Sequence, residues 1–99
     1  MSDDTGNGEQ LLSAVECLRD AEELVEGGDI EDQLYAEAET LEELAARDRA
    51  PDQRRLSGHR HTLREFHGRV DEDARDLVAS ALDHVVSVED AVGEGSGPW

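Results

Sequence analysis

Lysine is absent from this sequence: all nine basic residues are arginines, set against 26 acidic residues and giving a net charge of −17. A chain this acidic repels itself in dilute buffer, and salt screens the repulsion, with a Debye length of about 3 Å near 1 M. The composition therefore indicates a protein adapted to the concentrated salt of a halophile cytosol. An acidic disordered chain is the alternative interpretation.

Other features that are scarce or missing exclude whole classes of protein. The single cysteine, Cys17, excludes an internal disulfide. No apolar run approaches the ~20 residues needed to cross a bilayer. The acidic N-terminus, Met1–Asp4, lacks the positive charge and apolar run of a signal peptide. We therefore expect a cytoplasmic protein with a reduced thiol and no membrane partner, since anionic lipid repels an anionic protein.

Large apolar residues are also few, which makes folding marginal. Leu, Ile, Val and Phe together number 21 of 99 residues, just above the roughly 20% below which disorder is expected. Of the three aromatic residues, only Phe66 falls on a predicted core seam. A chain of this length has room for one hydrophobic core. We expect a single small domain with a thin core.

Helical periodicity decides in favour of folding. Apolar residues recur at intervals of three and four over four segments, which predicts helices at about 9–26, 29–48, 52–68 and 71–92. Residues 1–8 are predicted to be a disordered N-terminus and 94–99 a flexible tail, while Gly27-Gly28, Pro51, Gly68 and Gly93 end the helices. No stretch alternates as a strand does. The predicted core positions are Leu11, Ala14, Val15, Leu18, Ala21, Val25, Ile30, Leu34, Ala38, Leu41, Leu44, Ala45, Leu56, His59, Leu63, Phe66, Val70, Ala74, Val78, Ala81, Val85, Val88 and Val92, and Leu77 and Leu82 widen the apolar face of the fourth helix.

Short connections make consecutive helices antiparallel. The predicted fold is all-α: an up-down four-helix bundle, or two packed helical hairpins that can instead open and pair with a second chain. Three apolar residues, Leu12, Tyr35 and Val86, lie off their own seams. In so polar a chain they favour a homo-oligomer.

The only basic segment, residues 47–70, carries seven Arg and three acids, net +4, between flanks of net −14 (1–46) and −7 (71–99). Within it, Arg60, Arg64 and His67 form a stripe beside the apolar seam, where side chains usually meet a neighbouring helix. The favoured interpretation is that these arginines pair with acid-rich helices, within the subunit or across a dimer.

Nucleic-acid binding by the same helix is the alternative. It requires a basic outward face, and the outward residues Arg54, His61, Glu65 and Arg69 are mixed in sign. Phosphate binding also has to overcome the net charge of −17. Nucleic acid is therefore the less favoured partner, and it stays open.

Candidate chemistry is sparse. His59 and His61 are two residues apart and point to opposite sides of a helix, while His61 and Glu65 supply only two ligands. The Glu-x-x-His pairs of di-iron bundles, Cys-x-x-Cys and His-Glu-x-x-His are all absent. The serines and Cys17 lack a nucleophile context. We predict no metal, no cofactor and no catalytic residue, and hence no enzyme.

The order of elements resembles small acidic, all-helical haloarchaeal proteins of unknown function. The resemblance is carried by an acidic hairpin ending in residues 44–52 (LAARDRAPD), the Arg-rich helix containing Leu56, and a closing helix from Asp71 to Val92. It implies the fold and the habitat, and assigns no functional residues.

We therefore expect a non-enzymatic interaction or regulatory protein that works as a homo-oligomer, with a protein partner, or both. The alternative is a nucleic-acid-associated regulator. The candidate interaction residues are Arg54, Arg60, Arg64, His67, Leu12, Tyr35 and Val86.

Overall fold

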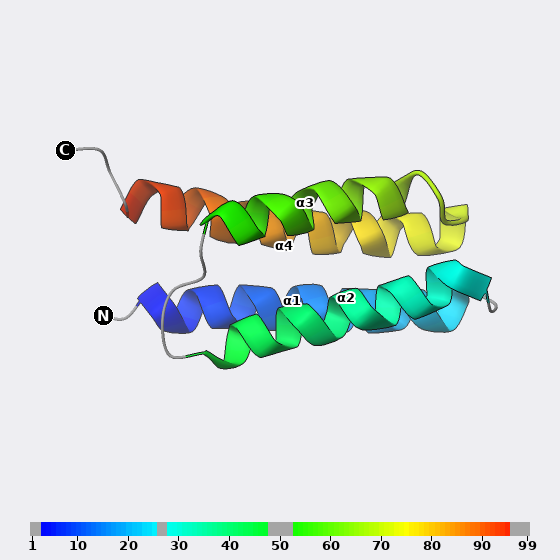
Figure 1. Cartoon of the computed structure of the whole chain (residues 1–99), viewed down its shortest axis with the longest axis horizontal. Coiled ribbons are helices and arrows are strands. Elements are labelled where there is room, and N and C mark those ends of the chain that lie inside the picture. The colour runs from blue at the N-terminus through cyan, green and yellow to red at the C-terminus, as the bar shows by residue number, and fades with distance from the viewer. Residues whose placement is uncertain (1–2, 26–27, 48–52, 96–99) are drawn as a thin grey trace.

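The computed structural model describes residues 3–25, 28–47 and 53–95, with the side chains of 8–25, 28–47 and 53–92. These residues form four α-helices and no strand: α1 (Asp3–Leu24), α2 (Gly28–Ala46), α3 (Gln53–His67) and α4 (Glu72–Gly95). Successive helices run antiparallel along an elongated body of 46 × 22 × 18 Å (Figure 1). The all-α prediction is confirmed.

The helices pack as two hairpins, α1 with α2 and α3 with α4, joined mainly through α1 and α4 (Figure 1). Among neighbouring helices, the α2 and α3 backbones approach each other least. Side-chain size explains the asymmetry. The buried apolar residues of α1 and α4 include four alanines, Ala14, Ala21, Ala74 and Ala81, whereas those of α2 and α3 are large apart from Ala38: Leu34, Leu41, Leu44, Leu56, Leu63 and Phe66. Small residues let two helices approach closely, and large ones hold their axes apart.

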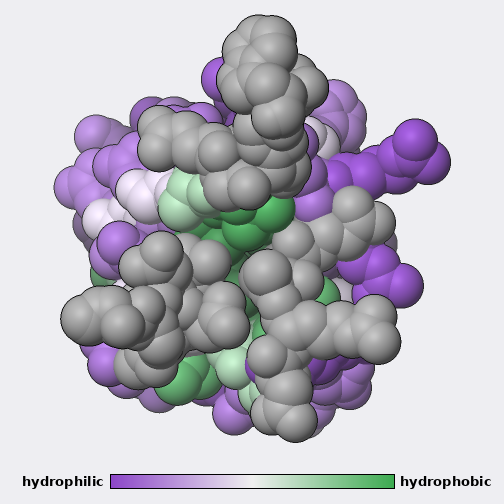
Figure 2. Space-filling model, turned by 90° about the vertical axis from the view of Figure 1, so that its left-hand side faces the viewer, coloured by the Kyte–Doolittle hydropathy of each residue, from purple (hydrophilic) through white to green (hydrophobic). Residues whose placement is uncertain are grey.

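The core follows the predicted periodicity closely. Every buried apolar residue of the described chain is one of the predicted core positions. The five predicted core positions that are not fully buried are half-buried: Val25, Ile30, Ala45, His59 and Val92. Figure 2, which looks along the bundle, shows apolar surface at its centre and polar surface around it. The amphipathic faces thus close into one core.

The first and last helices, α1 and α4, both extend beyond their predicted bounds. Asp3–Gly8 lie in α1, so the predicted disordered segment 1–8 is corrected over these residues. A Cβ on Gly8 would lie 3.6 Å from the Ala45 carbonyl oxygen, so the start of α1 packs on the end of α2, and packing outweighs the poor helix propensity of glycine. At its C-terminus α4 continues through Gly93 to Gly95. One glycine costs a helix only about 1 kcal/mol.

The turns within each hairpin form where glycine was expected to end a helix. Gly28 has a φ of +84°, the left-handed conformation that glycine adopts most easily. After α3, the Val70 amide donates to the Phe66 carbonyl at 3.0 Å and its side chain is buried, so it folds back on the last turn. The predicted stop at Pro51 lies outside the described residues.

Candidate functional site

The third helix is held to α2 by a buried polar contact. His59 Nδ1 lies 2.5 Å from Glu37 Oε2, with the imidazole donating to the carboxylate, and the two side chains are 14% and 10% exposed. Glu37 stands at the edge of the α2 apolar seam and His59 on the α3 seam, so the antiparallel packing brings them face to face. A second contact on this side joins Arg69 Nη1 to Gln33 Oε1 at 3.1 Å. His59 therefore has a structural partner.

On its opposite flank α3 is held to α4 by a buried carboxylate, Glu89, which is 7% exposed. The Ser57 hydroxyl donates to Glu89 Oε2 at 2.5 Å. Arg60 Nη1 lies 3.3 Å from Oε1 as an ion pair, but its angle makes no hydrogen bond, and Oε1 has no hydrogen-bond partner among the described atoms. The burial of Glu89 was not predicted from the sequence. The available signal was its position directly after the seam residue Val88, at the edge of the apolar face.

The other predicted residues of α3 lie at its surface. Arg64 is exposed and half-buried His67 follows three residues later; neither forms an ion pair with another described residue. Arg54 is exposed and has an interaction partner. His61 Nε2 lies 3.3 Å from Glu65 Oε2 on the outward side, where both side chains are well exposed. Of the stripe predicted from the periodicity, Arg60 therefore reaches a neighbouring helix and Arg64 stays available.

These α3 residues share a face with α4. Ser57, Arg60, Arg64 and His67 are spaced 3, 4, 3, and so are Ala79, Leu82, Val86 and Glu89. Because Ser57 and Arg60 both contact Glu89, the two stripes run side by side, and we call them together the basic face. Val86 was expected to be exposed; it is half-buried on this face. Leu82 is half-buried against the core.

The opposite hairpin has an acidic counterpart. Arg19 Nη2 lies 3.0 Å from Glu42 Oε1, and its guanidinium stands 5.9 Å from the Tyr35 ring centroid, so α1 and α2 are bridged across their outer surface. Leu12, Glu16, Arg19 and Glu23 are spaced 4, 3, 4 on α1, and Tyr35, Glu39 and Glu42 are spaced 4, 3 on α2. These seven residues are called the acidic face. Leu12 and Tyr35 are each 45% exposed on it.

Tyr35 is electrostatically coupled to this face. A hydrogen bond from its hydroxyl to Glu39 and the negative charge of that carboxylate raise the pKa of Tyr35 above its usual value, against the opposing effect of Arg19. The phenol is thus a neutral hydrogen-bond donor surrounded by carboxylates.

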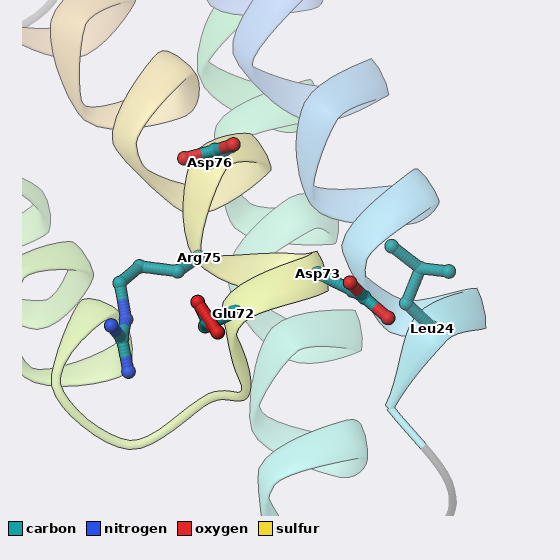
Figure 3. Close-up of a pocket in the computed structure, with 5 residues that line it drawn as sticks. All are labelled: Leu24, Glu72, Asp73, Arg75 and Asp76. Carbon is teal, nitrogen blue, oxygen red and sulfur yellow. The ribbon is translucent and has the colours of Figure 1, made fainter.

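A third exposed apolar residue, Leu24 (49% exposed), was missed by the sequence analysis. It borders two open depressions at the end of the bundle where the two hairpin turns lie. In Figure 3, Arg75 and Asp76 point away from Leu24, and Glu72 and Asp73 belong to the first turn of α4. Acids there are favoured by the helix dipole. The acids that line these depressions are therefore typical of a helix N-terminus, and the labelled polar side chains do not point toward one common position.

The remaining candidates for chemistry are separated from one another. Burial, with Asp20 and Glu16 nearby, raises the pKa of the Cys17 thiol, the reverse of an activated nucleophile. His84 Nδ1 donates to Gln10 Oε1 at 2.6 Å between α4 and α1. Within the described residues, no three His, Cys, Asp or Glu side chains are grouped to hold a metal ion. None of the described helices is both long enough and apolar enough to span a bilayer.

Comparison with protein-family models finds a match, over residues 7–90, to a family of unknown function designated DUF7553. The match covers most of the chain. The protein belongs to this DUF7553 family. No curated protein and no solved structure matches it. Membership confirms that the chain belongs to a family of unknown function, as the resemblance implied, while the haloarchaeal origin stays a prediction. It assigns no role to any residue.

Proposed function

We propose that this DUF7553 protein is a non-enzymatic protein–protein interaction or regulatory protein that works in the high-salt cytoplasm of a halophile. The observation that carries the proposal is the acidic face, which holds two of the three exposed large apolar residues of the described chain, Leu12 and Tyr35, each 45% exposed. Tyr and Arg are enriched among the residues that dominate binding energy at interfaces. Tyr35 and Arg19 stand together on this face.

High salt is part of the proposal because the acidic face is surrounded by uncompensated charge. Residues 1–46, which include α1 and α2, carry net −14. In dilute buffer this charge repels any acidic partner, whereas multi-molar KCl screens the repulsion. Association through Leu12 and Tyr35 is therefore expected to strengthen as KCl rises.

The test is a tagged purification from the host in multi-molar KCl. The wild-type protein is compared with Leu12→Glu/Tyr35→Glu and with a control, Ser80→Glu/Ser87→Glu, which adds the same charge at exposed positions of α4. We expect the wild type and the control to retain a stoichiometric protein, a host protein or a second copy, and the acidic-face variant to lose it. Equal retention by all three proteins, or no protein retained by any, overturns the proposal.

The nucleic-acid alternative has less support from the geometry. On the outward side of α3, His61 pairs with Glu65, and Arg60 is engaged by Glu89 on the flank. A nucleic-acid regulator requires affinity that falls steeply with salt. Co-eluting nucleic acid that is released by raising KCl would favour this second function.

A further inference from the structure

From the two faces we infer that the partner is a second copy of this chain, bound head to tail, with the acidic face of one copy on the basic face of the next. The inference deepens the proposed function and rests on it. Its starting point is that the chain carries two surfaces of complementary character on opposite hairpins.

Charge is the first part of the complementarity. The acidic face carries four carboxylates and one arginine, and that arginine is already paired with Glu42. The basic face carries Arg64, exposed and without an ion pair to another described residue, beside His67. Its one carboxylate, Glu89, is buried and occupied by Ser57 and Arg60. An acidic surface approaching this face therefore meets exposed Arg64, which no described carboxylate pairs, although Asp83 and Asp90 lie further round α4.

Length and apolar content match as well. The acidic face offers two projecting apolar groups, Leu12 and Tyr35. The basic face offers two half-buried ones, Leu82 and Val86. At a rise of about 1.5 Å per residue, the stripe from Leu12 to Glu23 is about 16 Å long and the stripe from Ser57 to His67 about 15 Å. The two surfaces can therefore be matched along their length.

The placement of the faces determines the kind of assembly. The acidic face lies on the α1–α2 hairpin and the basic face on the α3–α4 hairpin, which form opposite sides of the bundle (Figure 1). They cannot meet within one chain, and a two-fold dimer cannot satisfy both contacts. A head-to-tail contact is heterologous, and it produces a ring if the rotation closes and an open chain if it does not.

A complementation experiment tests this arrangement. One variant, Leu12→Glu/Tyr35→Glu, loses the acidic face, and another, Arg64→Glu, loses the basic face; both change exposed side chains outside the core. Helicity by circular dichroism verifies folding, and light scattering in multi-molar KCl gives the mass. We expect the wild type to exceed a dimer at high concentration, and each variant alone to associate at least tenfold more weakly, toward the 10.9 kDa monomer.

The decisive sample is the equimolar mixture of the two variants. Each then retains one intact face, so the mixture should form a dimer and stop there. Ser80→Glu/Ser87→Glu should assemble as the wild type does. A mixture that remains monomeric, a wild type that ends at an isologous dimer, or equal loss of assembly in the control overturns the inference.

Failure of this inference is distinguishable from failure of the proposed function. A wild type that is monomeric at every concentration, yet retains a host protein lost in Leu12→Glu/Tyr35→Glu, refutes head-to-tail assembly and leaves the interaction function standing. A monomer that retains nothing refutes both.

Discussion

His59 Nδ1 and Glu37 Oε2 meet at 2.5 Å across the α2–α3 seam, the pair of neighbouring helices whose backbones lie furthest apart. The contact is thus a polar tie at the place where backbone packing is weakest. Removing one member leaves the other buried without its partner, which costs more than removing both.

We therefore predict that Glu37→Ala lowers the free energy of unfolding by about 1–3 kcal/mol, because His59 loses its acceptor. The double variant Glu37→Leu/His59→Leu should recover most of that loss, since two apolar groups satisfy each other. Urea unfolding at constant multi-molar KCl measures both. The control is Glu65→Ala, which removes the exposed partner of His61 and should cost less than about 0.5 kcal/mol. Equal effects at Glu37 and Glu65 would contradict a structural role for the tie.

The serine on the other flank of α3 gives a second prediction. Ser57→Ala removes the hydrogen bond to buried Glu89, and we expect a loss of about 1–2 kcal/mol after the better helix propensity of alanine is counted. Ser80→Ala, on the exposed side of α4, is the matched control and should be neutral or stabilising by up to about 0.5 kcal/mol. The midpoints of thermal unfolding of both variants measure the difference. Indistinguishable midpoints would show that the Ser57 hydrogen bond to Glu89 does not stabilise the fold.

Two glycines should respond oppositely to alanine. Gly58 lies inside α3, and a Cβ there meets nothing within 4 Å, so Gly58→Ala should stabilise by about 1 kcal/mol. Gly28 has a φ of +84°, so Gly28→Ala should destabilise by about 1 kcal/mol or more although the space is equally open. Denaturant midpoints of the two variants measure the difference. A stabilising Gly28→Ala would mean that the turn relaxes to another conformation.

The alkylation rate of the Cys17 thiol should depend on pH. Its pKa is raised, first by burial and then by Asp20 and Glu16, so at a given pH below that pKa the folded protein holds less thiolate than an ordinary cysteine. Alkylation by iodoacetamide should therefore be slower in the folded than in the urea-unfolded chain, and its rate should rise with pH to a higher midpoint. Asp20→Asn should move that midpoint down. A folded midpoint at or below the unfolded one is the contrary result.

The heptad-like spacing of apolar residues determined most of the fold. Positions such as Leu34, Leu63 and Val85 repeat at intervals that only a helix brings to one side, so their burial followed from the amino-acid order. Glycine at position 28 determined a turn for an equally local reason, the low cost of positive φ. The helix ends were less predictable, because the contact between Gly8 and α2 that extends α1 belongs to the packed bundle.

Tertiary packing alone decided which side chains meet. The sequence placed Glu37, His59 and Arg60 near apolar seams, but only the order of helices around the bundle assigned His59 to Glu37 and Arg60 to Glu89. For the same reason, the sequence alone could not show that Leu12 and Tyr35 share one face. That depends on how Arg19 bridges α1 and α2. Periodicity determines the direction of a side chain from its own helix axis, whereas its partner depends on the neighbouring helix and its register.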